Sequence, residues 1–336
     1  MVEKKGRFIV PIFITYQGCP HKCVYCKQED ITGVSNALTE DEIKEIVSKA
    51  IGSKKYSKAK VREIAFYGGT FTNLDKEEIL RLLRIVRPYI NSYGFDSIRI
   101  STRPDKINPS ILGLLKNHKV ETIEIGVQSL DDKVLKASGR GHSSEDCIYA
   151  AKLIKEYGFR LGIQLMLGLP MQDEKSFLDT IQKVIDLSPE FVRIYPTIVI
   201  KGTALESLLL DGRYTPLTIQ ETIRICSKAV EMLEVNNISV IRIGLMNSQI
   251  LEANYVAGPY HPSLGHMIRC RVFLERLSRL VNKTDIKTHT FKIPKDKAAL
   301  FWGHKGEGLR ILKGLTGATN IRVLKERGEL EVRLEF

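Results

Sequence analysis

Short apolar runs alternate with amphipathic stretches over about the first two hundred residues of the chain. The apolar runs have the length and composition of buried strands. The expected strands are Phe8–Thr15, Glu63–Tyr67, Ser97–Thr102, Thr122–Val127, Leu161–Leu167 and Phe191–Val199. Between them, apolar residues recur every three or four positions, which predicts helices at Glu40–Ile51, Lys76–Tyr89, Ser144–Tyr157 and Glu174–Leu187.

Local signals support these helices at their ends. Thr39 and Ser144 are expected as N-caps, because a hydroxyl at that position accepts a hydrogen bond from a free backbone N–H of the first turn. Gly158 is expected to stop the third helix, and Pro88 to mark the end of the second.

Repeated β-α units predict an α/β fold with a parallel sheet and right-handed crossovers. Six units fit a partial (β/α)6 barrel of the TIM type, open on one side, because a complete eight-unit barrel usually needs about 250 residues. In such folds the functional side chains gather at the carboxyl ends of the strands.

The rest of the chain changes character twice. Residues 203–284 are expected to form a helical extension, with helices Thr218–Val235 and Gly265–Val281 and a further strand at Val240–Gly244. Residues 285–336 are expected to form a small α+β domain, read as strand, helix, tight loop, helix, strand and strand. The expected domains are therefore 1–202, 203–284 and 285–336.

Composition adds an electrostatic expectation. The chain has 336 residues and a formal net charge of +12, and residues 269–336 hold 16 Lys and Arg against 8 Asp and Glu. This asymmetry suggests a polyanionic partner, RNA first, but on its own it fits the solvated surface of a basic protein equally well. No apolar run reaches the roughly 20 residues of a membrane span. Val2–Arg7 is polar and basic and lacks the apolar region of a signal peptide, so a reducing cytoplasm is expected.

Three cysteines follow the first strand with the spacing C-x3-C-x2-C: Cys19, Cys23 and Cys26. Three thiolates this close can bind three irons of a [4Fe–4S] cluster and leave the fourth iron open. A zinc site usually takes cysteine pairs on two knuckles, and no second C-x2-C is present; a disulfide framework does not fit the expected compartment. The spacing resembles that of the radical SAM superfamily, in which the open iron chelates S-adenosylmethionine (SAM) and reductive cleavage gives a 5′-deoxyadenosyl radical.

Polar and glycine-containing motifs end the next strands. Gly68 and Gly69 allow close approach of a ligand, although a lone Gly-Gly is more often a turn. Arg103 is a bidentate donor for a carboxylate or, alternatively, the partner of a loop acid. The resemblance implies that SAM is held by Tyr25, Gly68, Gly69, Thr70, Ser101, Arg103 and Gln128.

Several longer stretches resemble one branch of the superfamily, the radical SAM half of the Elongator catalytic subunit and its short bacterial relatives. They are Phe66–Phe71, Thr102–Asp105, Ile123–Ser129, Gly139–His142, Ile194–Thr203 and Gly258–Pro262. The branch implies RNA as the substrate class, since Elongator modifies the wobble uridine of tRNA with acetyl-CoA. Only about fifty residues follow the extension here, so the acetyl-CoA chemistry of Elongator is not carried over to this chain.

The last segment contains Gly303-His304-Lys305-Gly306, which resembles the G-x-x-G loop of a K-homology (KH) domain. Such a loop clamps a single-stranded sugar-phosphate chain between two helices. The resemblance implies RNA binding by Gly303, His304, Lys305, Gly306, Arg310, Lys313 and Arg322, against the alternative of a structural helical hairpin. Trp302 is expected in the core.

The remaining thiols and histidines carry weaker expectations. Cys147 and Cys226 are expected to be buried apolar thiols. His261, His266 and Cys270 would bind zinc only with a further ligand, and a packed helix with nearby histidines is the simpler interpretation.

The sequence therefore predicts a radical SAM enzyme, with one [4Fe–4S] cluster and SAM as cofactors, that modifies tRNA or rRNA as a transferase. An electron donor such as ferredoxin or flavodoxin is implied. Two alternatives stay open: a small-molecule or peptide substrate with the tail as a lid or dimer surface, and a non-catalytic RNA-binding iron–sulfur protein. No catalytic side chain is identified from the sequence.

Overall fold

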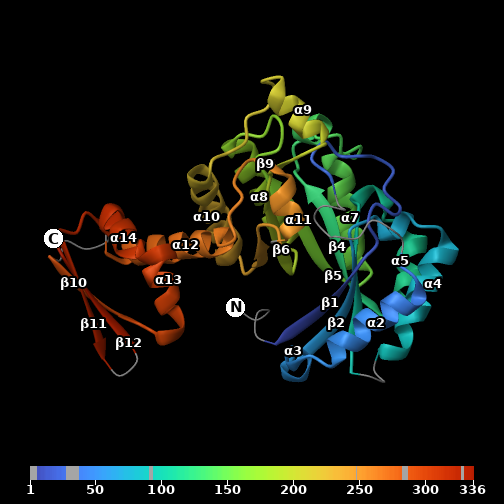
Figure 1. Cartoon of the computed structure of the whole chain (residues 1–336), viewed down its shortest axis with the longest axis horizontal. Helices are drawn as coiled ribbons and strands as arrows, with labels where there is room; N and C mark the ends of the chain where they lie inside the picture. Colours follow the sequence, from blue (N-terminus) through green and yellow to red (C-terminus); the bar gives the residue numbers. More distant parts are fainter. Residues whose placement is uncertain (1–5, 28–37, 91–93, 247, 282–286, 327–328) are drawn as a thin grey trace. The chain divides into compact units, whose positions relative to one another are not determined.

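A seven-stranded parallel sheet organises the larger of two units of the chain (Figure 1). The computed structural model describes residues 6–27, 38–90, 94–246, 248–281, 287–326 and 329–336. The barrel unit comprises Met1–Leu217 and Met232–Pro259, and the tail unit comprises Thr218–Glu231 and Tyr260–Phe336. The predicted division into three domains stays a prediction, and its boundary at 284–285 lies outside the described residues.

The main sheet has the strand order β1-β2-β3-β4-β5-β6-β8, with all neighbours parallel. Its strands are β1 (Arg7–Phe13), β2 (Val61–Tyr67), β3 (Ser97–Thr102), β4 (Val120–Gln128), β5 (Arg160–Leu167), β6 (Phe191–Pro196) and β8 (Ser239–Ile243). The prediction of a partial TIM-type barrel is confirmed. The further strand expected near Val240 joins this same sheet as its seventh member.

Helices follow the strands in the order that a parallel sheet requires. They are α2 (Glu40–Ile51), α3 (Lys54–Lys58), α4 (Lys76–Val86), α5 (Pro109–Lys116), α6 (Asp132–Ala137), α7 (Ser144–Glu156), α8 (Glu174–Leu187), α9 (Ala204–Leu210) and α11 (Gln249–Asn254). Short 3-10 turns lie at η1 (Phe71–Asn73), η2 (Arg87–Tyr89) and η3 (Pro104–Lys106), and β7 (Val199–Ile200) pairs with β9 (Tyr255–Ala257). Among the described residues, no helix is both long and apolar enough to cross a membrane.

Several predicted boundaries differ by one to three residues, and two of these differences have a clear local cause. The N-cap of α7 is Ser143, not Ser144, because Ser143 forms a reciprocal capping box with Asp146. Strand β6 ends at Pro196 rather than Val199, and Val199 belongs to the small antiparallel pair β7–β9. Thr39 caps α2 as predicted, and α4 gives way to a 3-10 turn around Pro88.

The inner face of the main sheet carries buried charge. The guanidinium of Arg99 on β3 donates to Glu63 of β2 at 2.6 Å and to Glu124 of β4 at 2.7 Å. Arg7 also pairs with Glu63, at 2.7 Å. Because each carboxylate has a cationic partner, these charges can be buried between the strands at a tolerable cost.

The tail unit follows the predicted order of elements. Its elements are α10 (Ile219–Val235, up to Glu231), α12 (Leu264–Val281), β10 (Thr288–Ile293), η4 (Lys295–Lys297), α13 (Ala298–Trp302), η5 (His304–Gly306), α14 (Gly308–Thr316), β11 (Asn320–Glu326) and β12 (Glu329–Glu335). The sheet is antiparallel with the order β10-β12-β11. Its core contains Phe301, Leu312, Val332 and Leu334, and Trp302 packs against that core as expected.

Candidate active site

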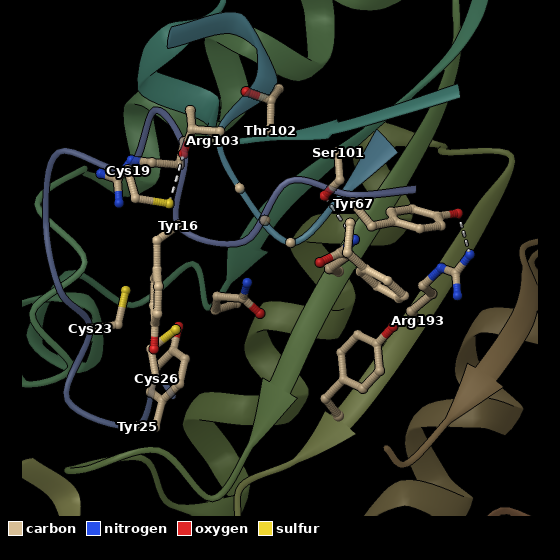
Figure 2. Close-up of a pocket in the computed structure, with 18 of the residues that line it drawn as sticks. Tyr16, Cys19, Cys23, Tyr25, Cys26, Tyr67, Ser101, Thr102, Arg103 and Arg193 are labelled. Atoms are coloured by element: carbon tan, nitrogen blue, oxygen red, sulfur yellow. Dashed lines mark hydrogen bonds between the residues drawn. The ribbon is translucent and has the colours of Figure 1, made fainter. Parts of the chain in front are cut away.

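A cavity of about 860 Å³ lies in the barrel unit, where residues from the carboxyl ends of the strands meet the cysteine loop (Figure 2). Every residue predicted from the sequence to bind the cluster or SAM lines this cavity. They are Cys19, Cys23, Tyr25, Cys26, Gly68, Gly69, Thr70, Ser101, Arg103 and Gln128. Residues from the ends of three strands, β2, β3 and β4, and from the cysteine loop are thus brought to one place, as expected for the carboxyl ends of parallel strands.

The cysteine loop is fixed by backbone contacts with the turn after β2. Tyr16 donates its N–H to the carbonyl of Gly68 at 3.0 Å, and Thr70 donates to the carbonyl of Gln17 at 2.8 Å. A Cβ on Gly69 would lie 2.5 Å from the Gln17 carbonyl oxygen, so the two backbones touch directly. Gly18 has φ +72 and equally little space, which explains why glycine precedes Cys19.

None of the three cysteines of this loop is part of a disulfide, and all three border the cavity. The Sγ of Cys19 lies 3.3 Å from Thr70 Oγ1, and the Sγ of Cys23 accepts a hydrogen bond from Arg140 at 3.1 Å. Within the described part of the chain, no group of three or more His, Cys, Asp or Glu is arranged to hold a metal ion. A cubane differs from a single ion, because each thiolate binds a separate iron corner. Three thiols border the cavity, and no carboxylate is found among its described lining residues. This set of donors fits a [4Fe–4S] cluster.

Gln128 provides the clearest sign that the cavity takes a ligand. It ends β4 with φ +65, and its Oε1 is buried without a hydrogen-bond partner. A buried acceptor left unsatisfied costs about 1–3 kcal/mol. A ribose hydroxyl would satisfy it, as the assignment of Gln128 to the SAM site requires.

Arg103 is held by protein groups. It donates to Asp105 Oδ1 at 2.9 Å and to the carbonyl of Arg140 at 2.6 Å. The loop salt bridge considered for Arg103 is therefore present, and its assignment as a partner of the SAM carboxylate stays a prediction.

Arg140 lies in the Gly139–His142 stretch but is not among the site residues predicted from the sequence. Its guanidinium donates to Cys23 Sγ, to the hydroxyl of Tyr25 at 3.3 Å and to the carbonyl of Gly126 at 2.6 Å. The available signal was an arginine between two glycines, since Gly139 and Gly141 both have positive φ.

His142, which follows this loop, is buried. Burial, reinforced by the charges of Arg140 and Arg103, lowers the pKa of His142 to about 3. The imidazole is therefore neutral at ordinary pH.

The side of the cavity formed by β2, β4 and β6 is an ion-paired wall. Arg193 lies 2.7 Å from Glu124 and donates to the hydroxyl of Tyr67 at 2.9 Å, a contact visible in Figure 2. Burial alone would raise the pKa of Glu124, but Arg193 and Arg99 outweigh it and lower that pKa to about 2. Glu124 is therefore an anion that fixes two arginines and is not a proton donor near neutral pH.

The tail unit presents the G-x-x-G segment as a turn between α13 and α14. Gly303 has φ +71 with ψ −172, and Gly306 has φ +79, conformations that favour glycine. Lys305 is exposed with φ +51, and Arg310 and Lys313 are exposed on α14. The loop and these cations therefore lie on adjoining parts of one surface.

Arg322 is not brought to this loop face. Its neighbours in β11, Ile321 and Val323, pack against the core, so Arg322 projects from the opposite face of the sheet. There it lies 3.5 Å from Glu335. Its assignment to the RNA groove gains no support from this placement.

The histidines and cysteine of the tail unit form contacts rather than a metal site. The ring of His261 meets that of His304 edge to face, with centroids 4.9 Å apart. His266 Nε2 lies 3.3 Å from Cys270 Sγ. No metal-binding group of three is found among the described residues of this unit either.

Comparison with known proteins agrees with this geometry. A sequence profile for the radical SAM superfamily matches residues 13–184, and one for the radical SAM C-terminal domain matches residues 189–273. An uncharacterized protein of Methanocaldococcus jannaschii is 31% identical over 240 residues, which is 68% of this chain and 73% of that protein. A tRNA uridine(34) acetyltransferase of the same organism is 26% identical over 266 residues, 68% of this chain and 49% of that protein. The chain thus spans about half the length of that enzyme.

One solved structure shows the similarity of fold. The archaeal Elp3 of Methanocaldococcus infernus superposes with a TM-score of 0.61 at 19% identity, over 86% of this chain and 71% of that one.

Proposed function

This chain belongs to the radical SAM superfamily and resembles its Elongator-like branch, and on that premise we propose that it modifies RNA. The superfamily uses a [4Fe–4S] cluster and SAM. When bound, these supply a 5′-deoxyadenosyl radical in the cavity. RNA as the substrate, and its delivery by the tail unit, are the parts of the proposal that need testing.

The residues around the cavity have separable tasks. Cys19, Cys23 and Cys26 would hold the cluster through their thiolates, and Arg140 positions Cys23 by its hydrogen bond. The bare backbone at Gly69 lets the turn after β2 pack directly against the cysteine loop, so Gly69 positions this loop at the cavity.

The remaining cavity residues hold and enclose the ligand. Gln128 would accept a hydrogen bond from a ribose hydroxyl through its unpartnered Oε1. Tyr25, half-buried beside the thiols, would shield the site from water, and desolvation raises the pKa of its hydroxyl so that it stays protonated.

The loop of the tail unit is the single observation that carries the RNA assignment. A strand, two helices joined by Gly303–Gly306, and two further antiparallel strands reproduce the element order of a KH-like module. Lys305 and Arg310 place exposed positive charge beside a glycine-rich backbone turn. A backbone of this shape is suited to contact with a sugar-phosphate chain.

The test compares RNA-stimulated SAM cleavage in wild type and Lys305→Asp. Aspartate tolerates the left-handed conformation of this position, so the fold is retained while the charge is reversed. We expect tRNA to stimulate release of 5′-deoxyadenosine by the anaerobically reconstituted wild type, and much less by the variant. Lys152→Asp, at an exposed lysine of the barrel unit, is the matched control.

Indifference to every RNA tested, with SAM cleavage intact, would instead favour a small-molecule or peptide substrate. Absence of 5′-deoxyadenosine under reducing conditions would favour a non-catalytic RNA-binding protein. From the sequence we keep the expectations of a reducing cytoplasm and of ferredoxin or flavodoxin as the electron donor.

A further inference from the structure

The wall of the cavity is strongly cationic. Lys22, Arg103, Arg140, Arg193 and Arg242 line it, whereas no Asp or Glu is found among the described residues that do so. The cysteine thiols are the anionic groups expected at one end. Electrostatically, the cavity is built for a ligand that brings negative charge of its own.

Most of these cations already have partners. Arg103 is paired with Asp105, Arg140 faces Cys23 and Tyr25, and Arg193 is paired with Glu124. Among these five cations, no anionic partner is described for Lys22 and Arg242. Lys22 is exposed to solvent, which leaves Arg242 as the candidate for binding a ligand inside the cavity.

Arg242 occupies an unusual position in β8. It stands in register with Arg193 of the neighbouring parallel strand, and both line the cavity. Like charges side by side on one sheet face are unfavourable. Arg193 is neutralised by Glu124. Arg242 instead donates from Nε to a neutral acceptor, the carbonyl of Gly244, at 2.9 Å. No carboxylate pairs with Arg242 in the part of the chain that the structure describes.

The surroundings of Arg242 would strengthen the binding of an anion. Tyr195 of β6 is a half-buried residue of the same wall, and desolvation raises the pKa of its hydroxyl, so it remains a neutral donor. Leu245 and Met246 add apolar surface to the same wall. In such an environment a charge-charge contact is worth more than in water. A guanidinium presents a planar fork of donors that fits two oxygens of a carboxylate or phosphate.

We propose that Arg242 forms a subsite for an oxyanion, a carboxylate or phosphate group, of the substrate that reacts in this cavity. The inference rests on the proposed function only in taking the cavity as the place of reaction, and it does not depend on the substrate being RNA. Anchoring a charged group at this wall would fix the reacting carbon relative to SAM.

The test measures anion binding by the reconstituted holoenzyme in the presence of saturating SAM, so that the SAM carboxylate subsite is filled. Isothermal titration with inorganic phosphate and, separately, with acetate distinguishes the two oxyanions. We expect saturable one-site binding of at least one probe, with Kd raised about tenfold or more in Arg242→Gln. Arg213→Gln, at an exposed arginine of the same unit, should bind as wild type.

A second variant protects the test against misfolding. Arg242→Lys keeps the charge without the fork and should bind with intermediate affinity. Tighter phosphate than acetate binding identifies a phosphate subsite, and the reverse identifies a carboxylate subsite. The inference is overturned if neither probe saturates, or if Arg242→Gln and Arg242→Lys both bind like wild type. Because SAM cleavage by the wild type is assayed separately, a failure here leaves the proposed function standing.

Discussion

The guanidinium of Arg140 lies 3.1 Å from the Sγ of Cys23 and donates a hydrogen bond to it. Another nitrogen of the same group holds the carbonyl of Gly126 at the end of β4, at 2.6 Å. A fixed positive charge thus connects the cysteine loop to the sheet. Hydrogen bonds and charge near the sulfur ligands are among the factors that set the potential of an iron–sulfur cluster.

Replacing Arg140 should therefore shift the cluster potential downward. In Arg140→Gln the reduced, more negative cluster loses a cationic neighbour, so reduction becomes harder. The shift reports how much stronger this hydrogen bond is in the reduced than in the oxidised state, and a difference of about 1 kcal/mol corresponds to about 40 mV for one electron. An EPR-monitored redox titration of the reconstituted protein measures it.

Arg140→Lys separates charge from geometry. Lysine retains the charge and should restore part of the potential. Equal potentials in wild type and Arg140→Gln would show that the contact has no electronic role.

Each single substitution Cys19→Ser, Cys23→Ser or Cys26→Ser should lower the iron and sulfide content of reconstituted protein, since serine replaces a thiolate ligand. Cys226→Ala is the matched control, because this thiol is buried away from the cavity lining. Iron and acid-labile sulfide assays give the readout. Full iron incorporation in all three serine variants would remove the basis for the cluster assignment.

The buried charges of the barrel should be coupled. Glu124→Gln leaves Arg99 and Arg193 without their shared anion, and breaking a buried pair typically costs about 3–5 kcal/mol. Chemical denaturation should show this loss in the free energy of unfolding. Removal of the exposed Lys175–Asp179 pair by Lys175→Met should give no measurable change.

His142 should make the protein sensitive to mild acid. Its pKa is about 3 in the fold, against 6.5 for the ordinary side chain, because of burial and of Arg140 and Arg103. Below pH 6.5 the unfolded chain binds a proton that the folded one does not, so stability falls as pH decreases towards 3. The expected loss is about 2 kcal/mol between pH 6.5 and 5. His142→Gln should flatten this slope in urea unfolding; parallel slopes would contradict the prediction.

The tail loop should contribute to RNA affinity through phosphate contacts. For single strands, the slope of log Kobs against log salt is about −0.7 for each neutralised phosphate. Lys305→Gln and Arg310→Gln should each reduce the slope by about 0.7, while Arg322→Gln, on the other sheet face, should not. Fluorescence anisotropy with labelled single-stranded RNA at several salt concentrations tests this, and an unchanged slope in the first two variants would argue against the loop.

The fold was largely predictable because the spacing of apolar residues along the chain shows which side chains are buried, and hence where strands and helices lie. The strands near Ser97 and Leu161 lie where their apolar runs indicated. The N-cap of α7 was misplaced because two serines compete there, and only Ser143 has an acid three residues later. Strand β6 was drawn too long because Pro196 interrupts an apolar run that continues into β7.

The site was predictable as far as it is built from motifs with local spacing. The spaced cysteines and the glycines at strand ends can be recognised from a single sequence by their spacing and by the strands that precede them. Arg140 cannot, since its partners Cys23 and Tyr25 are far away in the chain, and only folding shows that Arg242 stands beside Arg193. Whether such an arginine can contact a ligand depends on which face of the sheet it projects from. The sequence alone does not settle this for Arg242.

Gly308 touches the backbone of the preceding helix, and a Cβ there would lie 1.8 Å from the carbonyl oxygen of Phe301. Because α13 and α14 meet with no side chain between them, the turn that joins them has little freedom to rearrange. Its shape is settled when the protein folds, so the conformational entropy of the turn is not lost again on binding. Any partner of this turn meets a rigid template to which it must itself adapt.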